Sequence, residues 1–134
     1  MAVHFKQVAI IGVGLIGGSL GMILRRKALA DHVVGVGRRV ENLKTAVALG
    51  AIDRYVADPQ EGVRGADLVV LATPVDTYER HLHEWAHCLA PAAIVSDVGS
   101  VKGPLVERSE AAMPAGVHFV GAHPIAGKEK TGPA

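Results

Sequence analysis

A glycine-rich stretch near the start of the chain, "GVGLIGG" at residues 12–18, constrains the fold more than any other segment. It directly follows a short aliphatic run, Val8 to Ile11, which has the length and composition of a buried parallel strand. Behind it, Leu15 to Arg26 has the pattern of a helix, and the cations at its end suit a helix C-terminus. A strand that passes through glycines into a helix is typical of a β-α-β unit, so the sequence predicts a parallel sheet.

The rest of the chain continues this alternation. Further strands are expected at 33–36, 52–56, 68–72, 93–98 and 117–120. Further helices are expected at 41–49, 75–89 and 104–113, with 75–89 as the longest. Strands that alternate with helices predict an α/β fold with a Rossmann-type doubly wound parallel sheet. Because 134 residues is the length of one domain, we expect residues 1–134 to form a single domain.

Composition excludes several classes of protein. The formal net charge of +1 gives no argument for a nucleic-acid partner. The apolar runs are broken by glycine or polar residues well before the length of a membrane span, and the N-terminus lacks the apolar stretch of a secretory signal. A lone cysteine, Cys88, cannot form an internal disulfide, which suits a reducing compartment. We therefore expect a cytoplasmic domain with neither a nucleic acid nor a membrane as partner.

Three glycines of the opening stretch, Gly12, Gly14 and Gly17, form the pattern G-x-G-x-x-G. Gly12 would permit the tight turn, Gly14 would let the backbone approach a pyrophosphate, and Gly17 would let the helix pack closely on the strand. Leu15 and Ile16 belong to the same loop and would lie beside the same ligand. Because the motif follows a strand and opens a helix, it predicts a dinucleotide-binding site, whereas a tight turn without a ligand is the alternative.

The end of the second strand bears on which dinucleotide is bound. An NAD site is expected to carry an acid about twenty residues after the last glycine, to bind the ribose hydroxyls. Here the sequence reads Gly37, Arg38, Arg39 instead. A guanidinium can hold an additional ribose phosphate and stack on adenine, so NADP is expected and NAD is less favoured. In this hypothesis Arg38 is the main phosphate ligand and Arg39 assists; the alternative is that both are solvated loop cations.

A zinc-peptidase pattern, H-E-x-x-H, occurs at His83, Glu84 and His87. Helical geometry argues against a metal site, because an apolar stripe would lie on roughly the opposite side of the helix and turn the histidines to solvent. That stripe consists of Tyr78, Leu82, Trp85 and Leu89. We therefore expect no metal here.

Polar segments follow the later strands. In an open parallel sheet the ligand lies beyond the carboxyl ends of the strands. The fourth strand is closed by Thr73 and Pro74, the fifth by "SDVGSVK" at 96–102, and the sixth by "GAHPIAGKEKTG" at 121–132. We expect all three to converge near the nicotinamide end of a bound cofactor.

Three segments in this order resemble the prephenate/arogenate dehydrogenases of tyrosine biosynthesis: "GVGLIGGSLG", "DVGSVK" and "GAHPIAGKEKTG". The resemblance covers essentially the whole chain, and the histidine-containing segment is its most specific part. It implies oxidative decarboxylation of prephenate or its amino analogue arogenate. Hydride passes from the carbinol carbon to the nicotinamide, carbon dioxide leaves, and the ring becomes aromatic, which gives 4-hydroxyphenylpyruvate or tyrosine.

By match to the family motif, His123 is implied as the base that takes the hydroxyl proton, a task that suits a neutral imidazole near pH 7. Ser100 would hold the same hydroxyl, and Glu129 would act at the rim of the site. Lys128 departs from the family pattern, in which a small hydroxyl residue is expected. The alternatives are an ordinary loop histidine at 123 and a helix N-cap at Ser100.

The resemblance also implies a second, largely helical domain that supplies substrate-binding cations and the interface of a dimer. We expect this chain to be the dinucleotide-binding domain only, and to turn over little or nothing by itself. Two other interpretations stay open. One is a non-catalytic nucleotide-sensing Rossmann module. The other is the N-terminal domain of another two-domain dehydrogenase, of the hydroxyisobutyrate or pyrroline-carboxylate type.

Overall fold

The computed structural model describes residues 4–73, 77–97 and 118–120; for Leu15, Ile16 and 118–120 it describes the backbone only. The strands are β1 (Phe5–Ile11), β2 (Ala30–Val36), β3 (Arg54–Val56), β4 (Leu68–Leu71), β5 (Ile94–Asp97) and β6 (His118–Val120). The helices are α1 (Leu15–Arg26), α2 (Val40–Ala48), α3 (Pro59–Val63) and α4 (Tyr78–Trp85), which a 3₁₀ turn at Ala86–Cys88 extends.

The six strands form one sheet in the order β3-β2-β1-β4-β5-β6, and every neighbouring pair is parallel. The chain builds outward from β1 to the β3 edge, then returns to β4 on the other side of β1 and builds toward β6. This order confirms the predicted doubly wound sheet. The reversal between β1 and β4 opens a crevice at the carboxyl ends of these strands, where ligands bind in such folds.

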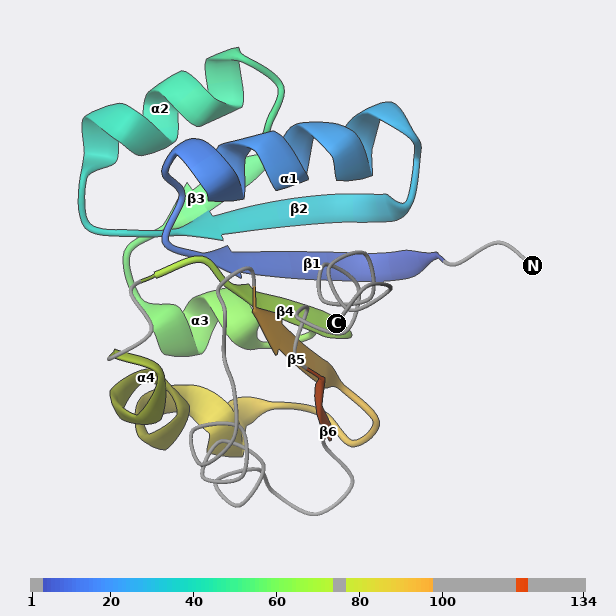
Figure 1. Cartoon of the computed structure of the whole chain (residues 1–134), viewed down its shortest axis with the longest axis vertical. Helices are drawn as coiled ribbons and strands as arrows, with labels where there is room; N and C mark the ends of the chain where they lie inside the picture. Colours follow the sequence, from blue (N-terminus) through green and yellow to red (C-terminus); the bar gives the residue numbers. More distant parts are fainter. Residues whose placement is uncertain (1–3, 74–76, 98–117, 121–134) are drawn as a thin grey trace, which may run out of the picture.

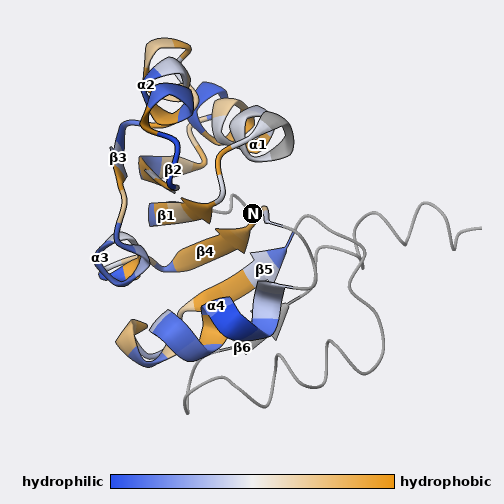
Figure 2. Cartoon of the chain, turned by 90° about the vertical axis from the view of Figure 1, so that its left-hand side faces the viewer, coloured by the Kyte–Doolittle hydropathy of each residue, from blue (hydrophilic) through white to orange (hydrophobic). Residues whose placement is uncertain are grey.

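Helices cover both faces of the sheet: α1 and α2 lie on one face, and α3 and α4 on the other (Figure 1). Alternate residues of β1 supply the two cores, because successive side chains of a strand point to opposite faces. Val8 and Ile10 pack with the α1/α2 core, whereas Ala9 and Ile11 pack with the α3/α4 core. In Figure 2, β1 and β4 are mostly hydrophobic, whereas α4 is mostly hydrophilic.

The structure corrects two expectations about helices. Helix α3 was not predicted, because five residues are too few for a visible period; its start is nevertheless signalled by Asp58, whose carboxylate accepts a bond from Gln60 N at 3.0 Å, and by Pro59. The segment 75–89 is not one long helix: α4 ends at Trp85, and the 12 residues of α1 make it the longest described helix. Pro91 disfavours helical backbone at Ala90, which agrees with the 3₁₀ turn after α4 ending at Cys88. The helix expected at 104–113 lies outside the described residues.

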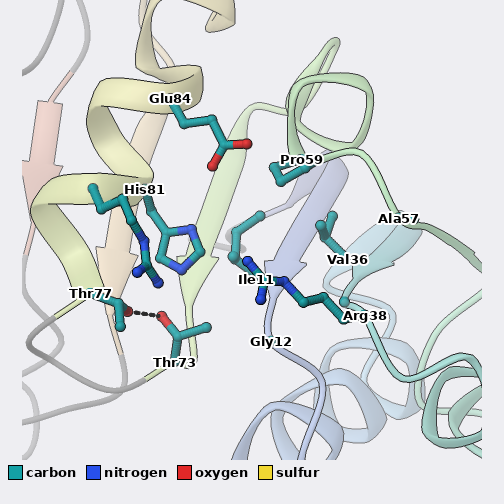
Figure 3. A pocket seen from close by; sticks show the side chains of 12 residues that line it. Ile11, Gly12, Val36, Arg38, Ala57, Pro59, Thr73, Thr77, His81 and Glu84 are labelled. Carbon is teal, nitrogen blue, oxygen red and sulfur yellow. Dashed lines mark hydrogen bonds between the residues drawn. The ribbon is translucent and has the colours of Figure 1, made fainter.

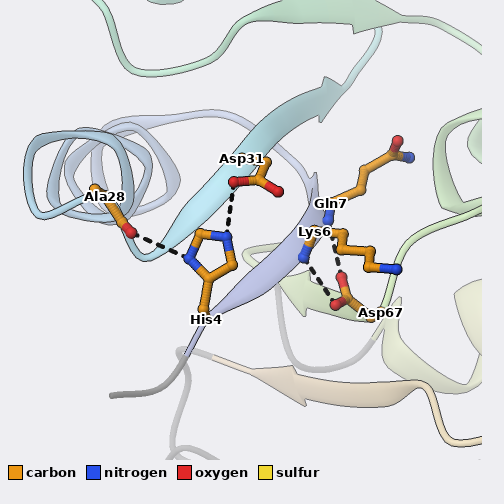
Figure 4. A network of polar contacts seen from close by, with 6 residues as sticks. All are labelled: His4, Lys6, Gln7, Ala28, Asp31 and Asp67. Carbon is orange, nitrogen blue, oxygen red and sulfur yellow. Dashed lines mark hydrogen bonds and ion pairs between the residues drawn. The ribbon is translucent and has the colours of Figure 1, made fainter.

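Polar contacts hold the amino ends of the strands together, at the edge opposite to the crevice (Figure 4). The Asp67 carboxylate accepts hydrogen bonds from the backbone N–H groups of Lys6 and Gln7, both at 2.9 Å. His4 bonds to the Asp31 carboxylate at 2.7 Å and to the Ala28 carbonyl at 3.2 Å. These contacts position β1 from its amino end, so the candidate ligand site can lie at the carboxyl ends of the strands.

Candidate functional site

The turn after β1 can be made only with glycine. Gly12 has a φ of +87°, in the left-handed region. A Cβ atom on Gly12 would lie 2.5 Å from the Thr73 Cγ2 atom and 3.1 Å from the Ala72 carbonyl oxygen. The tight turn that the sequence predicted is therefore confirmed, and it brings β1 and β4 together at the crevice.

The other two glycines of the motif have different surroundings. A Cβ atom on Gly17 would lie 2.7 Å from the Gly12 carbonyl oxygen and 3.2 Å from the Ala72 Cβ atom, so Gly17 allows α1 to pack closely on the sheet. A Cβ atom on Gly14 would meet nothing within 4 Å. Gly14 is the N-cap residue of α1, and the first turn of this helix holds no acidic residue. The start of α1 therefore has open space beside Gly14 and no side-chain cap from this residue, an arrangement that suits an anion.

A cavity of about 430 Å³ lies on one side of this turn, between the ends of β1 and β2 and the face of α4 (Figure 3). We call it the α4 cavity. Its apolar walls come from Ile11, Val36, Ala57 and Pro59. Its polar groups come from Arg38, Thr73, Thr77, Arg80, His81 and Glu84.

A second cavity of about 270 Å³, which we call the α2 cavity, adjoins the first. The two share four lining residues, Gly12, Gly37, Arg38 and Thr73. The α2 cavity adds Gly14 at the start of α1, and Arg39 and Asn42 at the start of α2. Arg38 and Arg39 are exposed, and neither forms an ion pair with any described residue. Two guanidinium groups without an ion pair in the described part of the chain therefore stand beside the glycine turn, where an anionic ligand would find its countercharge.

Sequence reasoning missed the wall that α4 contributes. Thr77, His81 and Glu84 follow one another at helical spacing, i, i+4 and i+7, and this polar stripe was the signal available in the sequence. The Thr77 hydroxyl contacts the Thr73 hydroxyl at 3.1 Å and so joins α4 to the end of β4. The Gln60 side chain donates to the Glu84 carbonyl at 2.9 Å and so holds α3 against α4.

His81 is the residue of this wall with the most perturbed environment. Its Nδ1 atom is buried and has no hydrogen-bond partner among the described residues. Burial lowers the pKa of the imidazole below its usual 6.5, and the positive charges of Arg80 and Arg38 lower it further, whereas Glu84 opposes them. This histidine was not among the predicted site residues.

The zinc-peptidase pattern does not form a cleft. Tyr78, Leu82, Trp85 and Leu89 are all buried, which confirms the predicted apolar stripe. His83 and His87 are exposed, as the stripe required. Glu84, the middle member of the pattern, lines the α4 cavity instead.

Several predicted site residues lie outside the described residues: Pro74, Ser100, His123 and Glu129. Only the backbone of Leu15 and Ile16 is described, at the start of α1. Asp97 is the last described residue of the fifth strand's polar segment. It is fully buried, and its carboxylate accepts a hydrogen bond from the Tyr78 hydroxyl at 3.3 Å.

The family model for the nucleotide-binding domain of prephenate dehydrogenase matches residues 20–134. The chain belongs to this family. Prephenate dehydrogenase of Bacillus subtilis is 34% identical over 95% of the chain, and cyclohexadienyl dehydrogenase of Zymomonas mobilis is 37% identical over 96%. The structure of Aquifex aeolicus prephenate dehydrogenase, solved with hydroxyphenyl propionate and NAD⁺, superimposes with a TM-score of 0.81 at 35% identity over 95% of the chain.

The chain spans less than half of the length of each of these three relatives: 34% of the Bacillus protein, 44% of the Zymomonas protein and 44% of the Aquifex chain. The hydroxyisobutyrate alternative is not favoured. A 3-hydroxyisobutyrate dehydrogenase from Mycobacterium tuberculosis has a TM-score of 0.75 but only 20% identity, which is a likeness of fold alone. No helix in the described part of the chain is long and apolar enough to cross a membrane.

Proposed function

We propose that the chain binds NADP and forms the nucleotide-binding part of a dehydrogenase that acts on prephenate or arogenate. The observation that carries the cofactor proposal is the position of Arg38, which lines both cavities beside the glycine turn. Family membership and the names of its relatives support the substrate class. An NAD⁺ complex of the Aquifex relative supports a nicotinamide dinucleotide as the ligand class.

The two cavities suggest how the ligand divides between them. The pyrophosphate would lie over Gly14 and the first turn of α1, where the space in front of the helix is open. The 2′-phosphate would lie in the α2 cavity, against Arg38 and Arg39. Gly37 would let the chain pass closely beside the ribose, with Thr73 and Pro74 on the β4 side.

For the reaction, bound NADP⁺ would supply the hydride acceptor. We propose that His123 takes the proton of the substrate hydroxyl and that Ser100 holds this hydroxyl in line for hydride transfer. Glu129 would make polar contacts at the rim. The substrate carries two carboxylates, and their countercharges would come from residues beyond this chain, as would the contacts of a dimer.

The cofactor proposal is tested by calorimetric titration of the chain with NADP⁺ and NAD⁺ in parallel. We expect tighter binding of NADP⁺, because a charge-assisted bond to the extra phosphate contributes about 1.5–3 kcal/mol. Arg38→Ala should then weaken NADP⁺ binding about 10- to 100-fold and change NAD⁺ binding much less. Arg64→Ala is the matched control, because Arg64 is equally exposed but lies near the amino end of β1, where its carbonyl accepts a bond from the Gln7 side chain.

Equal affinity for the two dinucleotides, unchanged in Arg38→Ala, would mean that the arginines are bystanders and that the selectivity proposal is wrong. Binding of neither dinucleotide would overturn the proposed function of the domain itself.

A further inference from the structure

The imidazole of His81 lines the α4 cavity, and the proposed function assigns it no role. Its ring stands on the α4 wall, and the side chains of His81 and Arg38 point toward one another across the cavity (Figure 3). Arg38 comes from the end of β2, so residues 43 positions apart in sequence face the same space because β2 and α4 both border the crevice.

The surroundings of the ring fix its tautomer. Nδ1 is buried without a partner among the described residues. Among buried backbone groups, an N–H without an acceptor is rarer than an acceptor without a donor, and the same preference applies to a ring nitrogen. The neutral ring therefore carries its hydrogen on Nε2 and leaves Nδ1 as the unpaired acceptor. A charged ring would place an unpaired N–H at Nδ1.

The charges around His81 also favour the neutral ring. Arg80 on α4 and Arg38 at the end of β2 are cations, and Glu84 on α4 is the only carboxylate among the described residues that line the cavity. Burial and the two cations lower the pKa of His81, and Glu84 only partly opposes them. Near pH 7 the residue is thus a neutral, flat ring with one N–H group to donate.

The lining of the two cavities separates the parts of a dinucleotide. The α2 cavity holds Arg39 and Asn42 and suits a phosphate. The α4 cavity has walls of Ile11, Val36 and Pro59 and suits a flat heteroaromatic ring. Its volume, about 430 Å³, falls within the range of small-molecule pockets. A purine in this cavity would lie against Arg38 on one side and reach α4 with its polar edge.

We propose that His81 is a base-recognition residue, whose Nε2–H group donates a hydrogen bond to a ring nitrogen of the adenine bound in the α4 cavity. This inference rests on the proposed dinucleotide function. It assigns the affinity for the base to α4, whereas Arg38 and Arg39 provide selectivity for the 2′-phosphate. Because adenine is common to both dinucleotides, the His81 contact contributes equally to NAD⁺ and NADP⁺.

The test compares variants by titration with NADP⁺, NAD⁺ and nicotinamide mononucleotide. His81→Phe keeps a flat ring and removes the N–H group, so it should weaken both dinucleotides by the same factor, about three- to tenfold, as expected for one neutral hydrogen bond. His81→Gln keeps a donor and should bind both more tightly than His81→Phe. Nicotinamide mononucleotide, which lacks adenine, should bind all variants alike. His83→Phe is the matched control, because His83 is the exposed histidine two positions along the same helix.

A second measurement follows the binding on the wild-type chain and uses a variant only to assign the His81 signals. The ring nitrogens of the seven histidines can be followed by ¹⁵N NMR in the wild-type chain, with His81 assigned from its missing signals in His81→Gln. We expect the Nε2 signal of His81 to move on addition of NAD⁺ or NADP⁺, and the ring to stay neutral at pH 7.

The outcomes separate the two proposals. If the wild-type chain binds dinucleotide while His81→Phe binds equally well and the His81 signals do not move, the base-recognition role is wrong and the proposed function stands. If His81→Phe weakens NADP⁺ alone, the residue contacts the phosphate and this proposal is also wrong. If the wild-type chain binds no dinucleotide, both proposals are overturned.

Discussion

At the scale of single residues, the glycines of the first turn act through three different physical constraints. Gly12 is required by its backbone conformation and Gly17 by the closeness of α1 to the sheet, whereas a Cβ atom on Gly14 would meet no atom of the described residues within 4 Å. A glycine at a helix N-terminus, at a position where the fold leaves room for a side chain, is where a ligand is expected to contact the backbone. Gly12 and Gly17 are therefore needed for the structure, whereas Gly14 is expected to be needed for binding of the ligand.

A prediction at this scale concerns Asp67, at the opposite edge of the sheet. Its carboxylate holds two backbone N–H groups at the start of β1, those of Lys6 and Gln7, at 2.9 Å. Asp67→Ala should lower the free energy of unfolding by about 1–3 kcal/mol, because hydrogen bonds to a charged group are lost. Urea denaturation measures this change.

The matched control is Asp31→Ala. Asp31 also bonds at short distance, to His4, but the two side chains are 65% and 47% exposed. An exposed ion pair of this kind contributes less than about 1 kcal/mol. Equal losses in the two variants would contradict the role given to Asp67, and dinucleotide affinity should be unchanged in both.

At the scale of secondary-structure elements, α1 offers a prediction on stability. Replacing a glycine by alanine should stabilise the chain at one position of this helix and destabilise it at another. A Cβ atom on Gly18 would meet nothing within 4 Å, whereas one on Gly21 would overlap the carbonyl oxygen of Ala51. Gly18→Ala should stabilise the chain by about 0.5–1 kcal/mol, because alanine loses less entropy than glycine in a helix. Gly21→Ala should destabilise it by about 1–3 kcal/mol, because α1 must move away from Ala51.

Thermal or urea denaturation of the two variants measures both changes in stability. If Gly21→Ala were as stable as the wild type, α1 would not approach the segment after α2 as closely as described here.

The elements differ in how far they could be predicted from the sequence. Helix α1 was predicted with its observed bounds, because a glycine turn opens it and cations close it. Strands β1 and β2 begin three residues earlier than expected, since their first residues are polar or partly exposed and carry no aliphatic run. The end of α4 was predicted too late in the chain. The apolar stripe continues to Leu89 through a 3₁₀ turn, so the pattern of apolar residues did not reveal the change from α-helix to 3₁₀ helix.

At the scale of the whole molecule, the strand order explains why half of the candidate site was predictable. The alternation of strands and helices predicts a parallel sheet, and its carboxyl ends then predict the glycine turn, Arg38 and Thr73 as neighbours. The α4 wall could not be predicted this way. Whether the polar stripe of α4 faces the end of β2 depends on how the helix is rotated on the sheet, and this rotation is set by the burial of Tyr78 and Trp85.

The last prediction concerns the activity of the chain taken alone. With NADP⁺ and prephenate both in excess, we expect no formation of reduced cofactor above the rate without protein. The physical reason is that the substrate brings two carboxylates, whose desolvation needs cationic partners. The resemblance implies that these partners belong to a second domain, and the chain spans 34% of the Bacillus relative. Absorbance of the reduced nicotinamide measures the rate, and calorimetry on the same sample must show that NADP⁺ is bound. Turnover that disappears in His123→Ala would contradict this prediction, because it would mean that these 134 residues hold a complete active site.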